Sequence, residues 1–105
     1  MDKVKAYIHK PVEVKAIQFI VDSDKNPILE FLCLTDEYKI KNKHIILWRN
    51  KNATLELFKQ ETCILIINTK EGPVTVKNRE YIIKDRMGFY NVMREDLFLK
   101  YYYEK

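Results

Sequence analysis

The chain has 105 residues, of which 47% are hydrophobic and 32% charged, and its formal net charge is +4. This composition argues against a disordered chain, and the length predicts a single domain over residues 1–105. No apolar run approaches the roughly 20 residues that cross a bilayer, and no apolar stretch follows the N-terminal lysines as a secretion signal requires, so we expect a cytoplasmic protein without a membrane partner.

The first predicted strand covers residues 12–20, VEVKAIQFI. Val12 and Val14 alternate with Glu13 and Lys15, a pattern typical of a strand with one buried face. After Lys15 the alternation slips by one residue, and a slip of one residue exchanges the two faces of a strand. The pattern therefore indicates either a β-bulge or a strand that is buried on both faces.

A short helix is predicted next in the chain. Asn26 followed by Pro27 is typical of an N-cap with proline at the first helical position, where its missing N–H costs nothing. We expect this helix to end near residues 35–36. The apolar residues that follow Pro27 at helical spacing are Ile28, Leu29, Phe31 and Leu32.

The rest of the chain is predicted as short strands at spacings of about 8–12 residues. CILIINT, residues 63–69, is typical of a central strand buried on both faces, and in the following KEGPV turn Pro73 is expected to end the pairing. Residues 81–84 and 89–93 form a predicted hairpin around Gly88, which can adopt a positive φ. MREDLF then predicts one helical turn, and LKYYYE an edge strand or tail.

These elements predict an α+β fold. The strands follow one another without intervening helices, which favours antiparallel pairing. We therefore expect one small antiparallel β-sheet, curled or barrel-like, with one short helix after the first strand.

Both ends of the chain resemble a family of small bacteriophage and prophage proteins. Members open with a segment like KKPV-V-A-Q, which appears here as HKPVEVKAIQF at residues 9–19. They close with PGDYIIKG and then GEFYPCKPDIFEKTYE, which is matched at residues 80–84, 88–90, 96–98 and 100–104. The likeness covers about a third of the chain. It departs from the family where Pro-Gly-Asp becomes Asn78-Arg79-Glu80, where Asp85 replaces a glycine and where Met93 replaces a cysteine.

No set of residues with the spacing of a catalytic or metal site is present in the sequence. There is no phosphate-binding glycine loop, nucleophile elbow or metal-ligand motif. His9 and His44 have no local partner, and the adjacent Glu95 and Asp96 predict a cap or solvated turn rather than an acid–base pair. We therefore expect no enzymatic activity, no metal and no cofactor.

Two cysteines, Cys33 and Cys63, lie among apolar neighbours in the sequence. In a reducing compartment this setting predicts buried free thiols rather than a disulfide.

Residues 38–52 form a basic stretch that contains no acidic residue. Strand periodicity places its three lysines on one face, beside aromatic residues. Cations beside aromatics suit phosphate backbones and stacked bases, whereas a solvated outer face that discourages sheet aggregation is the alternative. The candidate binding residues in the stretch are Lys39, Lys41, Lys43, Trp48, Arg49 and Lys51.

The tyrosine-rich end, residues 101–103, is a second candidate surface. Three consecutive tyrosines cannot all face inward on a strand, so at least one is exposed, and exposed tyrosine is favoured at protein interfaces. Tyr101 and Tyr103 are the candidate binding residues. In the alternative interpretation Tyr102 packs inside and the other two flank a sheet edge.

The resemblance and the two surfaces together predict a non-enzymatic binding protein of the phage type. Its partner would be a bacterial host or defence protein, such as a CRISPR-type nuclease complex, which it inhibits or modulates in the bacterial cytoplasm. One alternative is a nucleic-acid-binding accessory protein that uses the basic stretch. The other is a structural or assembly protein that forms a homodimer or larger homo-oligomer.

Overall fold

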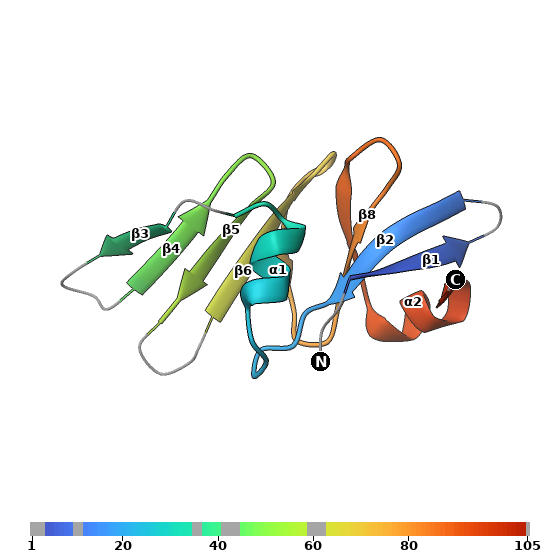
Figure 1. Cartoon of the computed structure of the whole chain (residues 1–105), viewed down its shortest axis with the longest axis horizontal. Coiled ribbons are helices and arrows are strands. Elements are labelled where there is room, and N and C mark those ends of the chain that lie inside the picture. The colour runs from blue at the N-terminus through green and yellow to red at the C-terminus, as the bar shows by residue number, and fades with distance from the viewer. Residues whose placement is uncertain (1–3, 10–11, 35–36, 41–44, 59–62, 105) are drawn as a thin grey trace.

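Two open antiparallel sheets and two short helices build the fold. The computed structural model describes residues 4–9, 12–34, 37–40, 45–58 and 63–104 (Figure 1). The molecule is elongated, with extents of 49 × 25 × 20 Å, because the two sheets lie one after the other along its long axis. Within the described residues, neither helix has the length and apolar character that crossing a membrane requires.

The first sheet joins the two ends of the chain. Its strand order is β10-β1-β2-β8-β9. The strands are β1 (Lys5–His9), β2 (Val12–Gln18), β8 (Tyr81–Lys84), β9 (Tyr90–Met93) and β10 (Tyr103–Glu104). The central strand β2 pairs with β1 on one side and with β8 on the other, where Ile17 lies opposite Ile82. Residues of the opening and closing segments therefore lie side by side.

The second sheet is a meander in the order β3-β4-β5-β6-β7. Each strand pairs with its neighbour in the chain, as short connections between antiparallel strands favour. The strands are β3 (Glu37–Ile40), β4 (Ile45–Arg49), β5 (Ala53–Leu57), β6 (Cys63–Thr69) and β7 (Gly72–Val76).

The predicted α+β class and the antiparallel pairing are confirmed, but the prediction of a single curled or barrel-like sheet is wrong. The structure has two sheets, and neither closes into a barrel. After β2 the chain leaves the first sheet through helix α1 (Asn26–Phe31), and strands β3 to β7 then pair only among themselves. The chain returns to the first sheet at β8, and a second helix, α2 (Glu95–Tyr101), follows β9.

Strand β2 is buried on both faces, which explains the slip in its alternation. Val14 and Ala16 are buried in a small core between the first sheet and α2. Ile17, and Phe19 just beyond the strand, are buried in the main core, which also contains residues of α1 and of the second sheet. The register with β8 continues without interruption through this region, so the second of the two predicted explanations is correct.

Strand β6 and Pro73 differ from their predictions. In β6, Leu65 and Ile67 are fully buried while Ile64 is exposed, so only one face of this strand is covered. Pro73 lies within β7, opposite Asn68, rather than ending the pairing. Proline is tolerated there because β7 is an edge strand and one side of it needs no N–H donor.

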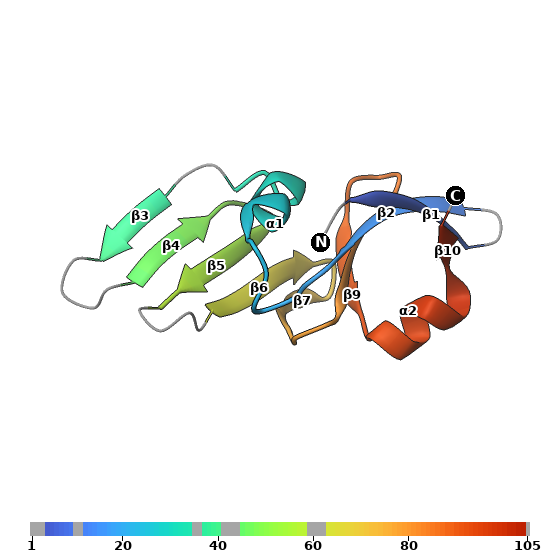
Figure 2. The same ribbon diagram turned by 60° about the horizontal axis from the view of Figure 1, so that its bottom comes forward.

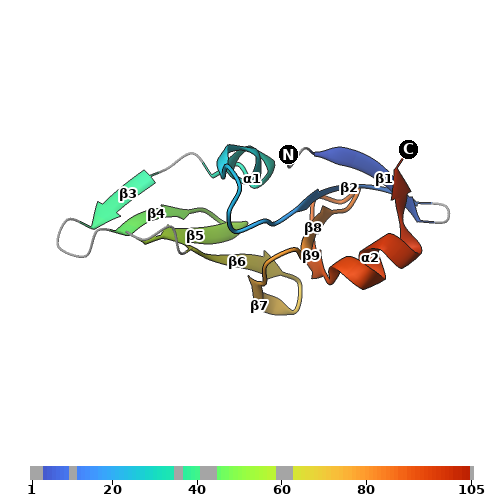
Figure 3. The same cartoon turned by 90° about the horizontal axis from the view of Figure 1, so that it is seen from below.

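Helix α1 (Asn26–Phe31) lies over the second sheet (Figure 3). Its N-cap is Lys25, one residue before the predicted Asn26, and the N–H of Asn26 donates to the Asp24 carboxylate at 3.1 Å. The side chain that satisfies the first N–H of the helix therefore comes from Asp24. Ile28 and Phe31 are the buried residues of the helix, and both belong to the main core.

The C-terminus of α1 closes in a Schellman arrangement around Cys33. The N–H of Leu34 donates to the Leu29 carbonyl at 2.8 Å, and that of Cys33 to the Glu30 carbonyl at 3.1 Å. Cys33 has a φ of +57°, a conformation that usually selects glycine at this position.

Neither cysteine is fully buried, in contrast to the prediction. Cys33 is exposed, because the left-handed turn that ends α1 places it at the surface. Cys63 is partly buried in β6, and this burial raises the pKa of its thiol. Both are free thiols, as predicted.

Helix α2 (Glu95–Tyr101) packs on the face of the first sheet that is opposite the main core (Figures 2 and 3). It is longer than the single predicted turn, so residues 99–101 are helical rather than part of an edge strand or tail. Glu95 and Asp96 in its first turn and Lys100 in its last turn suit the helix dipole. Phe98 is the buried residue that attaches the helix to the sheet.

Candidate binding surface

The described part of the predicted basic stretch does not form one surface. Lys41 and Lys43 lie outside the described residues, and of Lys39 only the backbone, in β3, is described. Trp48 and Arg49 are adjacent in β4, so their side chains project to opposite faces of the sheet. Trp48 is partly buried against the main core, whereas Arg49 is exposed.

Lys51 is exposed in the turn between β4 and β5, and its two neighbours have a structural role. The Asn50 amide donates to the carbonyls of Leu32 and Cys33 at 2.9 and 2.8 Å, and the Asn52 amide donates to the Leu32 carbonyl at 3.0 Å. This turn therefore holds the C-terminal end of α1. Asparagines on both sides of Lys51, between two predicted strands, are the signal from which a turn with side-chain hydrogen bonds could have been predicted.

The tyrosine-rich end is exposed at two of its three positions. Tyr101 is 46% exposed and Tyr103 61% exposed, so the expectation that at least one faces solvent is confirmed. Tyr102 is half-buried and stacks on Phe98, with ring centroids 4.9 Å apart. In Figure 1, α2 lies at the opposite end of the molecule from β3 and β4, so the structure does not bring the two predicted surfaces together.

The turn between β8 and β9 presents two large apolar side chains to solvent. Met87 is 79% exposed and Phe89 45% exposed. The Asp85 carboxylate accepts from the backbone N–H groups of both residues, at 2.9 and 3.0 Å, and Gly88 between them has the predicted positive φ, at +88°. These contacts stabilise the conformation of the turn. Large apolar residues within a short turn, where polar residues are usual, are the sequence signal that could have identified this feature.

The neighbouring turn between β6 and β7 extends this exposed region. The Lys70 ammonium lies 4.2 Å from the centroid of the Phe89 ring, a cation–π contact that joins a turn of the second sheet to one of the first. Arg86 is exposed beside Met87. We call the four residues Lys70, Arg86, Met87 and Phe89 the turn surface. Methionine, aromatic residues and arginine are the types that are enriched at protein interfaces.

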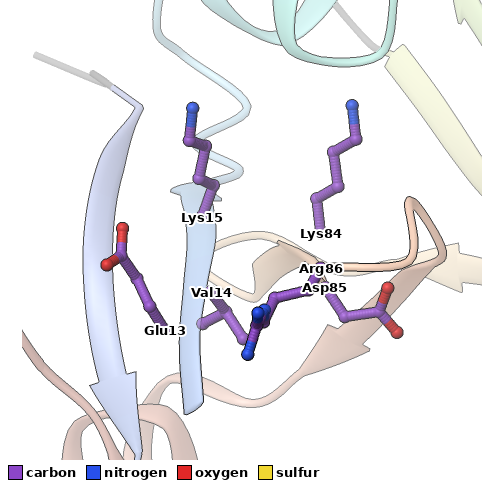
Figure 4. Close-up of a pocket in the computed structure, with 6 residues that line it drawn as sticks. All are labelled: Glu13, Val14, Lys15, Lys84, Asp85 and Arg86. Atoms are coloured by element: carbon purple, nitrogen blue, oxygen red, sulfur yellow. The ribbon is translucent and has the colours of Figure 1, made fainter.

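A pocket of about 540 Å³ lies beside the turn surface, between β2 and the end of β8 (Figure 4). Lys15 and Lys84 are directly opposite each other in the strand register, and Figure 4 shows their side chains extending in the same direction. The Asp85 side chain points away from both lysines. We call this site the basic pocket, and its lining residues are Glu13, Val14, Lys15, Lys84, Asp85 and Arg86.

Glu95 and Asp96 lie in the first turn of α2, after its N-cap residue Arg94, so they are helical rather than the predicted cap or solvated turn. Glu95 accepts from Arg79 at 3.0 and 3.1 Å and from the Gln18 amide at 2.7 Å. The hydrogen bond from Arg79, followed by that from Gln18, holds the pKa of the Glu95 carboxyl below its ordinary value. Arg79 has a φ of +76° and stands where the resembling family has glycine.

The lowered pKa of Glu95 predicts a pH-dependent contribution to stability. Because the folded-state pKa lies below the unfolded-state value, this contribution is complete above about pH 5 and is lost as the pH falls through the folded-state pKa. Urea unfolding of wild type and Glu95→Gln across the acid range should show wild type losing stability relative to the variant as the pH falls. A difference between the two proteins that is independent of pH would contradict the prediction.

Metal-ligating side chains are not clustered in the described residues. There, no three or more histidine, cysteine, aspartate or glutamate side chains are grouped to hold a metal ion. His44 lies outside the described residues, and only the backbone of His9, in β1, is described. Comparison of the chain with protein-family models, curated proteins and solved structures finds no match. The resemblance to phage and prophage proteins therefore stays a prediction from the quoted residues.

Proposed function

We propose that the protein binds another protein through the turn surface and has no catalytic role of its own. On this proposal it is a phage-type protein that inhibits or modulates a bacterial host or defence protein in the bacterial cytoplasm. The exposure of Met87 and Phe89 on a turn held by Asp85 is the observation that carries the binding proposal. The resemblance of the two chain ends to phage and prophage proteins supports the proposed source.

A fixed turn favours binding because it reduces the entropy that association costs. Flexible loops lose conformational freedom when they bind, and a loop that already has its bound conformation avoids most of this loss. Here four hydrogen bonds close the turn: the two to the Asp85 carboxylate, one from the Asp85 N–H to the Phe89 carbonyl at 3.0 Å and one from the Gly88 N–H to the Asp85 carbonyl at 3.1 Å. An exposed apolar anchor in such a turn gains free energy when a partner buries it.

The protein partner is favoured over nucleic acid by the composition of the turn surface. Methionine and phenylalanine gain free energy from an apolar pocket, whereas nucleic-acid surfaces require a line of cations along the backbone. The nucleic-acid alternative depends on the lysines of the basic stretch, and the described residues of that stretch are divided between two faces and a turn.

Capture from a nuclease-treated bacterial lysate tests this function. Immobilised wild-type protein should retain one dominant bacterial protein, and the double variant Met87→Ser/Phe89→Ser should lose it. The control Val4→Ser/Leu99→Ser removes two other exposed apolar side chains and should retain the partner. All three proteins should show the same thermal unfolding. Equal retention by the Met87/Phe89 variant, or absence of any retained protein, would overturn the proposal.

A further inference from the structure

We propose that the basic pocket binds an acidic segment of the partner protein, in which Asp or Glu side chains are placed between Lys15 and Lys84. This inference rests on the proposed function and adds the chemistry of the partner. The basic pocket adjoins the turn surface and shares Arg86 with it, since Asp85 and Arg86 line the pocket and Met87 follows them.

The cations of the basic pocket are not used in ion pairs within the described part of the chain. The two ion pairs there join Arg79 to Glu95 and Arg94 to Asp96. Lys84 makes a longer cation–π contact, with its ammonium 5.5 Å from the centroid of the Tyr90 ring. Lys15, Lys84 and Arg86 therefore keep their hydrogen-bond donors for a ligand.

The register makes this pocket receptive to negative charge. Like charges directly opposite each other on neighbouring strands destabilise a sheet, and Lys15 lies opposite Lys84. A carboxylate between the two ammonium groups replaces their repulsion with two attractions. The pocket volume of about 540 Å³ is within the range of small-ligand sites, so it accommodates acidic side chains rather than a single ion.

Carboxylates fit this pocket better than a phosphate backbone does. Glu13 and Asp85 also line the pocket, and a continuous row of phosphates would pass close to their negative charges. The Asp85 carboxylate is already engaged by the N–H groups of the turn, so it stays in place. A peptide can instead present separate acidic groups to the lysines and an apolar side chain to Met87 and Phe89.

Fluorescence anisotropy at low salt tests the inference with three labelled probes: a Glu/Ser peptide, a Gln/Ser peptide of the same length and a short oligothymidine. Wild-type protein should bind the Glu/Ser peptide and neither of the others to a comparable extent. Lys15→Gln/Lys84→Gln should weaken this binding by about fivefold, which corresponds to about 1 kcal/mol for the two exposed charge pairs together. The control Lys77→Gln/Lys100→Gln has the same net charge as the Lys15/Lys84 variant, and its two substitutions are at exposed positions. This control should bind the Glu/Ser peptide like wild type.

Three results would overturn the inference: no binding of the acidic peptide, tighter binding of the oligonucleotide, or equal weakening in the two double-lysine variants. Met87→Ser/Phe89→Ser should still bind the acidic peptide, because its lysines are unchanged. Loss of lysate capture in that variant tests the proposed function separately, so failure of the basic pocket is distinguishable from failure of the turn surface.

Discussion

Replacing Phe98 with alanine is expected to lower the free energy of unfolding by about 3–5 kcal/mol, the usual cost of removing a fully buried phenylalanine. Phe98 is completely buried and stacks between two tyrosines. Its ring centroid lies 3.9 Å from that of Tyr81 and 4.9 Å from that of Tyr102. The seven-residue α2 is too short to persist without packing, so the helix should lose its attachment to the first sheet.

Urea denaturation followed by circular dichroism measures this effect. Leu99→Ala is the matched control, because Leu99 is the next residue of the same helix and is 59% exposed. The control should change stability by no more than about 0.5 kcal/mol. Similar stability losses in the two variants would show that α2 does not pack through Phe98.

Asn50→Ala should destabilise the fold by about 2–3 kcal/mol, because the side chain makes four hydrogen bonds and each contributes roughly 0.5–1.5 kcal/mol. Its amide donates to the carbonyls of Leu32 and Cys33, and its oxygen accepts from the N–H groups of Asn52 and Ala53 at 2.7 and 3.0 Å. The variant loses the hydrogen bonds that stabilise the turn and those that connect the turn to the C-terminal end of α1. Thermal or urea unfolding gives the measurement.

Asn50→Asp separates these two roles. The carboxylate keeps the acceptor for the turn but replaces the amide donor with negative charge beside two carbonyl oxygens. At neutral pH this variant should be at least as unstable as Asn50→Ala. Wild-type stability in Asn50→Asp would mean that the contact with α1 contributes nothing.

Local features of the fold were predictable from sequence. The strand Tyr81–Lys84 matches its predicted limits, and Gly88 has the expected positive φ, because both depend on neighbouring residues alone. The division into two sheets was not predictable in this way. It depends on the pairing of β2 with β8, which joins residues more than sixty positions apart, and periodicity carries no information about such pairing.

The candidate site was harder to predict from the sequence, because it also depends on contacts between residues that are distant in the chain. The charged pair in the basic pocket exists only because Lys15 lies opposite Lys84 in the register. Lys70 approaches Phe89 only because two turns from different sheets meet. The basic stretch was visible as a run of charges, but its alternation could not show that Trp48 packs against the main core.

Site-specific photo-crosslinking tests the central claim most directly. A photoreactive phenylalanine analogue is placed in turn at positions 87, 89, 101 and 103, and each protein is irradiated in bacterial lysate. The turn surface predicts one and the same covalent adduct with a bacterial protein from positions 87 and 89, and none from 101 and 103. An adduct that forms from the tyrosine-rich end and not from the turn would contradict the account.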